Sequence, residues 1–300
     1  VATLPDEDNG ITTSASGAVI GSTTGLIVID ALAPRVSTVT LMQTTDLKIK
    51  GTIGDMISSF TASYSLGILD TLYLKYQREE KIVDSEMRLV FVDNIANAPP
   101  FLHEDLKQEC MALASDFEAD DGIPLIELKK PSHSGDMSMR RPIKKTICER
   151  SIATGRCIDI IDAPAEVVCA YLYDFNSNQR LRISKEEGNP AKLILKDDGR
   201  QLLYATIKTV QWPLYNREFV AQMIWWKDMI SGAHYVASVS VSDVIDYGLK
   251  MKSIRGYTRN LAKIEPYGDI GEDGRQQQCQ VKYTQILDAG GFLPDFVVNS

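Results

Sequence analysis

The sequence predicts an α+β protein that combines a long antiparallel sheet with a few amphipathic helices. Residues 192–285 consist almost entirely of strand patterns separated by turn residues. Elsewhere, apolar residues recur at steps of three and four, which is the spacing of one face of a helix. The chain has 300 residues, of which 44% are hydrophobic and 24% charged, so it can bury an ordinary core and is long enough for two domains.

The charge of the chain excludes one class of partner, and its cysteine content indicates the redox state of its compartment. A formal net charge of −8 would repel a phosphate backbone, so we expect no nucleic-acid partner. The cysteines are odd in number and form no CxxC pair, which is typical of a reducing compartment and predicts a cytoplasmic protein. No apolar run reaches the roughly 18 residues of a membrane-spanning helix, so any membrane contact is expected to be peripheral.

The N-terminal part of the chain predicts a β-hairpin followed by a helix. Residues 25–30 and 36–41 alternate loosely between apolar and polar side chains, and residues 33–35 supply a turn between them. Apolar residues from 53 to 76 then follow the helical period, and the charged stretch 75–81 ends this pattern.

A second unit is predicted to begin after residue 100. Pro99 and Pro100 cannot lie inside a helix or a central strand, so residues 82–100 are interpreted as a linker. An amphipathic helix is then predicted from the apolar stripe Leu102, Leu106, Cys110, Leu113 and Phe117.

Shorter elements separate this helix from the meander. Strands are predicted at residues 123–129 and 157–161. The polar composition of residues 131–141 predicts an exposed loop. Asp162 is a suitable N-cap and Pro164 suits a first helical turn, so a helix is expected after them. Hairpin turns of the meander are expected at residues 196–199, 231–232 and 271–274.

Two parts of the chain resemble each other in order and in spacing. Residues 256–265 lie over residues 21–30, and residues 291–295 lie over residues 51–55. Any two hairpins can share one such segment, but two segments in the same order favour a repeated unit. The chain is therefore interpreted as a window from a longer polypeptide with tandem copies.

Residues 212–220 carry a motif of a known family. Their sequence, Trp-Pro-Leu-Tyr-Asn-Arg-Glu-Phe-Val, resembles an element of START domains, the StAR-related lipid-transfer family. Residues 256–266 resemble the family's strand before its last hairpin, and residues 288–294 resemble its link into the final helix. The resemblance covers about residues 102–300.

This resemblance implies a helix-grip fold, in which a curved antiparallel sheet wraps a long C-terminal helix around a lipid cavity. It implies that residues 1–81 are the C-terminal part of a preceding START-like domain, with its last strands and final helix. Residues 82–100 then form the linker, and residues 101–300 form a START-like domain that lacks most of its final helix.

The strand parity supplies candidate residues for the cavity lining. Alternate residues of a strand share one face, so an apolar set that recurs at every second position can face a cavity or a filled core. Because START domains hold lipids, the resemblance favours the cavity. The candidates from parity are Phe219, Ala221, Met223, Trp225, Cys279, Val281 and Tyr283.

Two polar residues complete the candidate site. Tyr204 can donate a hydrogen bond to a ligand or can be a rim residue without a specific role. Arg217 can bind a lipid headgroup or can anchor its loop to a neighbouring acid. Sterol-carrying members have an acid and an arginine where a gap-free match puts Tyr204 and Met223. The resemblance therefore implies a phospholipid or other acyl lipid as the partner, in preference to a sterol.

Residues 242–248 match the position of a mobile loop beside the lipid entrance of similar proteins. Val244, Ile245 and Tyr247 are candidates for a gating loop that touches a membrane surface during lipid exchange. The alternative is that the loop folds these side chains inward.

The residue types that catalysis or metal binding would need are not grouped in this sequence. The three histidines have no ligand-like spacing, and Asp121 stands where a calcium loop of this register needs glycine. Nucleotide-binding and hydrolase fingerprints are missing as well. We therefore expect a non-enzymatic protein with no cofactor and no metal, whose function is to bind and transfer a lipid. A regulatory or scaffold module with a packed cavity is the alternative, and a hydrolase or cyclase of similar fold ranks below it.

Overall fold

The computed structural model describes most of the strands and helices of the chain. The described residues are 22–33, 36–46, 67–76, 79–98, 104–119, 124–128, 135–140, 154–189, 191–210, 214–241, 252–271, 274 and 276–291. The chain divides into two compact units, Val1–Met87 and Arg88–Ser300, and each is described by itself.

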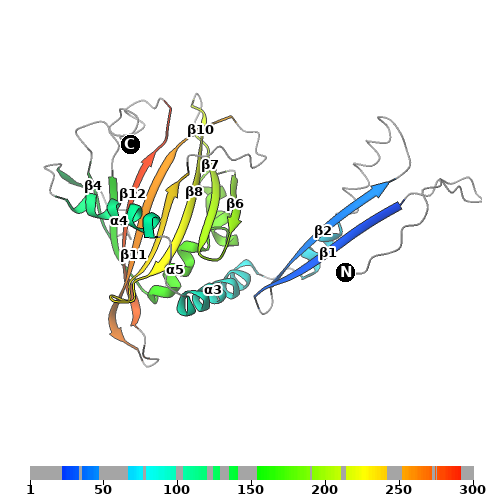
Figure 1. Ribbon diagram of the computed structural model, residues 1–300, viewed down its shortest axis with the longest axis horizontal. Coiled ribbons are helices and arrows are strands. Elements are labelled where there is room, and N and C mark those ends of the chain that lie inside the picture. The colour runs from blue at the N-terminus through cyan, green and yellow to red at the C-terminus, as the bar shows by residue number, and fades with distance from the viewer. Residues whose placement is uncertain are drawn as a thin grey trace, which may run out of the picture. The chain divides into compact units, whose positions relative to one another are not determined.

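The first unit contains the predicted hairpin and part of the predicted helix (Figure 1). Strands β1 (Ser22–Ala33) and β2 (Val36–Asp46) pair antiparallel, and helix α2 spans Ile68–Tyr76. Large apolar side chains are exposed along both strands, including the neighbours Leu26 and Ile27, which point to opposite faces of the hairpin.

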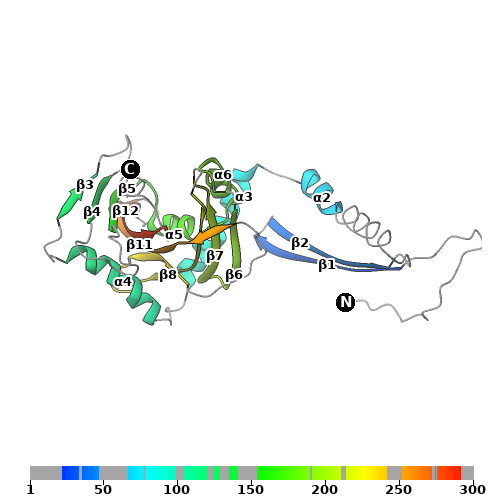
Figure 2. The same cartoon turned by 90° about the horizontal axis from the view of Figure 1, so that it is seen from above.

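The second unit is built on one large sheet, which Figures 1 and 2 show from two sides. Its strand order is β3-β4-β5-β12-β11-β9-β8-β7-β6, with antiparallel neighbours, and β10 pairs parallel to β8. The strands are β3 (Leu125–Glu127), β4 (Asp136–Arg140), β5 (Thr154–Ile161), β6 (Ala191–Asp197), β7 (Gln201–Lys208), β8 (Asn216–Lys227), β9 (His234–Ser240), β10 (Ser253–Arg255), β11 (Tyr257–Ile270) and β12 (Gln276–Asp288). The α+β prediction with a long antiparallel meander is thus confirmed. The final helix of the helix-grip arrangement would follow residue 291 and lies outside the described residues.

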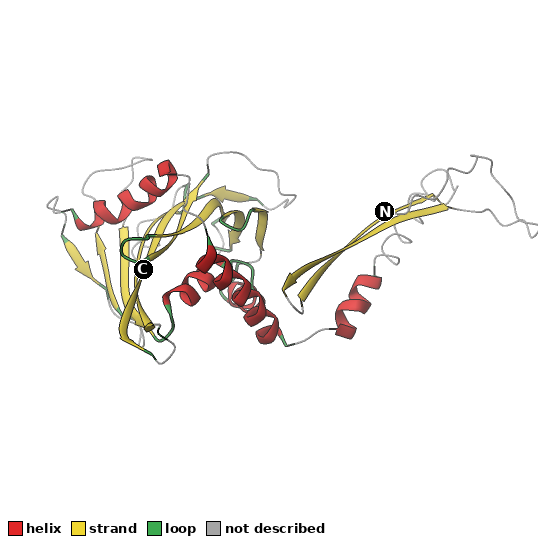
Figure 3. Ribbon diagram, turned by 60° about the horizontal axis from the view of Figure 1, so that its bottom comes forward, coloured by secondary structure: helices red, strands yellow, loops and turns green. Residues whose placement is uncertain are grey.

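Helices cover both faces of this sheet (Figure 3). The second unit contains α3 (Glu80–Asn97) from Arg88 onward, α4 (Glu104–Glu118), α5 (Ala165–Tyr173) and α6 (Asn178–Glu186). On one face, Cys110 of α4 belongs to a buried cluster with Ile224 and Trp226 of β8. On the other face, α5 packs in a cluster that includes Met223 and Trp225. Neighbouring residues of β8 therefore enter different cores, as the period of two requires.

Three local predictions differ from the structure. The segment 82–100, interpreted as a linker, holds most of α3, which ends at Asn97 before the two prolines and whose Ile95 is buried in the core of the second unit. The loop expected at 131–141 contains β4, which pairs with β3 and β5. Helix α5 has Pro164 at its N-cap without a side-chain cap, while Asp162 accepts a hydrogen bond from Gln278 instead.

A buried histidine at the start of β9 gives this unit a predicted pH dependence. Burial of His234, assisted by the positive charge of Lys227, lowers the pKa of the imidazole to about 4 from its ordinary 6.5. Between these two pH values the unfolded chain binds more protons than the folded chain, so the free energy of unfolding rises with pH.

We expect His234→Gln to flatten this part of the stability profile. The wild-type unit should lose on the order of 3 kcal/mol more than the variant as pH falls from about 6.5 to about 4. Urea denaturation of both proteins across this range is the measurement. Identical pH profiles for the two proteins would contradict the assignment.

Candidate functional site

A cavity of about 300 Å³ lies on the face of the sheet that α5 covers. Its size is at the lower end of the range of small-molecule pockets. It is lined by Leu172, Phe175, Arg180, Asn189, Tyr204, Thr206, Lys208, Phe219, Met223, Val236, Ser238, Thr258, Asn260, Ala262, Tyr283, Gln285 and Leu287.

The strand residues of this lining lie at alternate positions. On β11 the lining residues are Thr258, Asn260 and Ala262, and β12 contributes every second residue from Tyr283. Side chains at positions i and i+2 of a strand share a face, so five neighbouring strands present one surface to the cavity. The remaining wall comes from the end of α5, from the segment that follows it and from α6.

Arg180 is the charged residue that the fold holds most firmly at this cavity. Its Nη1 donates to the carbonyl oxygens of Tyr171, Leu172 and Asp174 at 3.0, 2.7 and 3.3 Å. The last turn of α5 supplies the carbonyls of Tyr171 and Leu172, and its C-cap residue supplies that of Asp174. Ser177 caps α6 by accepting a hydrogen bond from the backbone N–H of Arg180. Burial lowers the pKa of the guanidinium from its ordinary value.

Phe175 brings a second cation close to this arginine. The Lys192 Nζ lies 4.0 Å from the centroid of the Phe175 ring, and the Arg180 guanidinium lies 5.7 Å from the same centroid. Burial, followed by the charge of Arg180, lowers the pKa of Lys192 to about 8. The two cations repel each other in a partly desolvated place, so a negative group between them would be stabilised.

Two tyrosines add hydroxyl groups to the same region. The Tyr204 ring packs on Phe175 with centroids 4.0 Å apart, and burial raises the pKa of its phenol. Burial also raises the pKa of Tyr283. Both phenols therefore stay protonated near neutral pH and can donate a hydrogen bond to a ligand.

The structure brings four of the predicted lining residues to the cavity. These are Tyr204, Phe219, Met223 and Tyr283. Four others lie on the same face but fill the core beside the cavity: Ala221, Trp225, Cys279 and Val281. The parity argument thus identified the correct face. It could not tell which half of the face is filled by α5.

Arg217 does not line the cavity in this structure. It is buried at the start of β8 and donates through Nη1 to the carbonyl oxygen of Tyr215. This contact joins Arg217 to a carbonyl oxygen of its own loop, and its roles toward a headgroup or an acid stay predictions. The candidate gating residues Val244, Ile245 and Tyr247 lie outside the described residues, as do Trp212 and Pro213 of the START-like motif.

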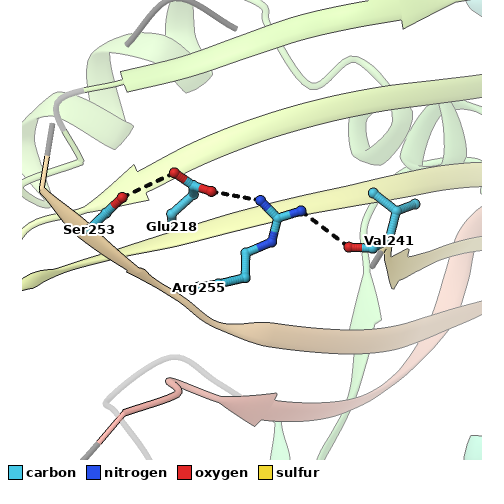
Figure 4. Close-up of polar contacts among 4 residues, drawn as sticks. All are labelled: Glu218, Val241, Ser253 and Arg255. Atoms are coloured by element: carbon cyan, nitrogen blue, oxygen red, sulfur yellow. Dashed lines mark hydrogen bonds and ion pairs between the residues drawn. The ribbon is translucent and has the colours of Figure 1, made fainter. Parts of the chain in front are cut away.

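The motif residue Glu218 instead ties three strands together beside the cavity (Figure 4). Its carboxylate accepts hydrogen bonds from Arg255 Nη1 at 2.6 Å and from Ser253 Oγ at 3.0 Å, and Arg255 Nη2 donates to the Val241 carbonyl oxygen at 3.2 Å. The backbone N–H of Gly256 also donates to the Glu218 carbonyl oxygen at 2.8 Å. This network fixes the strand ends around Phe219, the next residue of β8.

Sequence reasoning missed the wall that α5 and α6 provide. Leu172, Phe175 and Arg180 come from short elements without a long periodic pattern. The possible signal was an arginine in the first turn of a helix directly after an apolar helix. Nothing in the sequence separates such a residue from an ordinary surface cation.

The described part of the chain holds neither a metal-ligand cluster nor a membrane-spanning helix. There, no three or more His, Cys, Asp and Glu side chains are grouped so that they could hold a metal ion. None of the helices described is both long and apolar enough to cross a membrane.

Comparisons with known proteins find similarity in structure but not in sequence. No protein-family model matches the chain, and no curated protein matches it. One similar solved structure is the human StarD13 (DLC2) lipid transfer and protein localization domain, with 15% identity, coverage of 66% of this chain and 88% of that chain, and a TM-score of 0.43. Human STARD10 has 20% identity, coverage of 64% and 71%, and a TM-score of 0.44. A STAR-related lipid transfer protein fragment from Xanthomonas axonopodis has 18% identity, coverage of 58% and 88%, and a TM-score of 0.45.

The close approach of Gly256 to the cavity wall gives a testable prediction. A Cβ at Gly256 would lie 2.3 Å from Cε1 of Phe219, so Gly256→Ala must displace that ring from the cavity wall. We expect the variant to lose about 1–3 kcal/mol of unfolding free energy, as overpacked cores do, measured by urea denaturation. The double variant Gly256→Ala with Phe219→Leu should regain most of this loss. A double variant no more stable than Gly256→Ala would contradict the packing account.

Proposed function

We propose that the unit Arg88–Ser300 binds a lipid in this cavity, with the polar end of the lipid beside Arg180 and its alkyl part among Phe219, Met223 and Leu287. The observation that carries the proposal is a half-buried guanidinium that hydrogen bonds fix at the wall of a partly apolar cavity. A charge held out of water is costly unless a partner of opposite charge meets it. Backbone carbonyls and the nearby negative charge of Asp174 compensate Arg180 in part, and an anionic headgroup would add a charge-assisted hydrogen bond.

The charges of the lining favour an acyl lipid with a phosphate or carboxylate over a sterol. Among the described lining residues the two charged side chains, Arg180 and Lys208, are both cationic. A sterol hydroxyl is neutral and would leave their charge uncompensated. Each methylene that leaves water on binding contributes roughly 0.8 kcal/mol, so the alkyl part would supply most of the affinity.

The cavity volume limits which lipids fit this form of the protein. About 300 Å³ accommodates a single alkyl chain more readily than a lipid with two long chains. A single-chain lipid such as a fatty acid or a lysophospholipid is therefore the first ligand to test. Intermembrane transfer of that lipid, with no enzymatic turnover, is the activity we propose for this unit.

Residues 1–81 are proposed to be the C-terminal part of a preceding START-like domain. Hairpin β1–β2 followed by helix α2 repeats the order of the last hairpin and final helix of the family. Apolar side chains on both faces of the hairpin support this proposal, because strands inside a sheet that is covered on both faces have that composition. A cytoplasmic location with peripheral membrane contact is proposed for the whole chain.

A substitution at Arg180 tests the headgroup assignment. We expect Arg180→Met to lower the affinity for a fatty acid or lysophospholipid at least tenfold, because charge-assisted hydrogen bonds are stronger than neutral ones. Fluorescent fatty-acid displacement measures the affinity, and circular dichroism checks the fold. Arg182→Met, an exposed arginine of the same helix, is the matched control and should bind normally. Equal affinity of both variants for the lipid would show that Arg180 does not bind the headgroup.

A larger side chain in the cavity separates the lipid-binding function from the packed-scaffold alternative. We expect Met223→Trp to abolish co-purification of lipid, observed by native mass spectrometry, while the unfolding free energy changes by less than about 1 kcal/mol. A filled core would instead be overpacked and lose about 1–3 kcal/mol. Such a loss of unfolding free energy in the variant, together with the absence of bound lipid in the wild-type protein, would favour the packed-scaffold alternative.

A further inference from the structure

The turn between β8 and β9 holds two large apolar side chains in solvent. Met229 is 76% exposed and Ile230 is 98% exposed. The turn is nevertheless well ordered, because the Asp228 carboxylate accepts from the Ile230 N–H at 2.9 Å and from Ser231 Oγ at 2.8 Å. The backbone N–H of Gly232 also donates to the Asp228 carbonyl oxygen at 2.9 Å. The one acid of the turn thus points at its own backbone, and apolar groups form the outer surface.

A second hairpin at the same end of the sheet has a similar surface. On β9, His234 pairs with Ile264 of β11, and β11 continues beyond this pair to Ile270. Ile270 is 70% exposed, and Tyr267 is also exposed. The β8–β9 turn and the β11–β12 hairpin therefore project from one end of the sheet, as Figure 1 shows. We call Met229, Ile230, Tyr267 and Ile270 the apolar sheet end.

The shape of the apolar sheet end favours a lipid bilayer over a protein as its partner. A stable protein interface buries about 800 Å² on each partner, which requires a continuous surface. Here the exposed apolar groups stand on two separate hairpins, Met229 and Ile230 in the β8–β9 turn and Tyr267 and Ile270 at the end of strand β11, so they suit a deformable partner into which each hairpin can insert. A lipid bilayer is such a partner, and isoleucine, methionine and tyrosine are favourable in its interfacial region.

The charge next to the tips is mixed, because Asp228 lies in the β8–β9 turn and the exposed Asp269 lies between Tyr267 and Ile270, so the apolar groups and not the charge favour this partner. Lys227 is exposed directly before the β8–β9 turn, where its ammonium group can meet lipid phosphates while its alkyl stem lies along the apolar groups. We propose that the apolar sheet end inserts into the headgroup region of a bilayer and anchors the second unit there.

This anchoring does not depend on the proposed lipid cavity. The cavity is lined on β11 by Thr258, Asn260 and Ala262, whereas the apolar sheet end begins at Tyr267 of the same strand. At about 3.4 Å per residue, five residues separate the two sites by roughly 17 Å. A protein that bound no lipid in its cavity could still dock by this end.

A local fluorescence probe tests the proposal in the full chain. We would replace Ile230 by tryptophan and add vesicles of phosphatidylcholine and phosphatidylserine, with and without bromine on the acyl chains. The resident Trp225 and Trp226 are buried and serve as the common background. We expect Ile230→Trp to show a blue-shifted emission that brominated vesicles quench at least twofold more than they quench the parent protein.

The matched control is Ile194→Trp, a partly exposed apolar position on the edge strand β6. This probe should show no quenching beyond that of the parent protein. Equal quenching of the two probes, or none at Ile230→Trp, would overturn the proposal. Sedimentation without vesicles adds a further check: a self-association that Ile230→Asp abolishes would assign this end to a second copy of the chain and reject the bilayer.

Discussion

The architecture of the second unit depends on strands that must bury both of their faces. On β8, Ile224 and Trp226 enter the core beneath α4, while Met223 and Trp225 enter the core beneath α5. Helix α4 covers its face with a buried stripe, but α5 is only nine residues long. Its apolar side chains fill one half of the opposite face, and the cavity lies along the other half. Among the described residues, the hollow therefore lies on the part of this face that α5 does not fill.

The charge of Arg180 gives this hollow its chemical character. The C-terminal end of α5 places three carbonyl oxygens around its Nη1 atom, which fixes the guanidinium at the wall. The depressed pKa values of Arg180 and Lys192 both result mainly from burial. A negative headgroup would raise both values again, so ligand binding and charge stabilisation would support each other. The same cations would make the affinity for neutral lipids lower than the affinity for anionic lipids.

The sequence was informative wherever a regular period governed the structure. The meander, its hairpin turns and helix α4 followed from alternation and from apolar stripes. The same alternation placed Phe219 and Met223 on the face that contains the cavity. The alternation of side chains along a strand does not show how far a covering helix extends over the sheet. Trp225 and Cys279 were therefore predicted to line the cavity, although they are packed in the core beside it.

Features that depend on contacts between distant segments were not predictable. Arg180 gains its importance from carbonyls placed by a turn and from the ring of Phe175. Helix α3 was hidden by its neighbouring prolines, and its role became visible only through the packing of Ile95 against the core. Strand β4 has a polar sequence and exists because β3 and β5 offer it hydrogen-bonding edges.

The most direct test of the account is where a bound alkyl chain lies in the protein. A fatty acid that carries a photoreactive group at its methyl end would be incubated with the full chain, activated by light and mapped by peptide mass spectrometry. The account predicts cross-links to the cavity wall around Phe219, Met223 and Tyr283, which excess unlabelled fatty acid suppresses. Cross-links confined to exposed segments such as α2, unaffected by competitor, would contradict it.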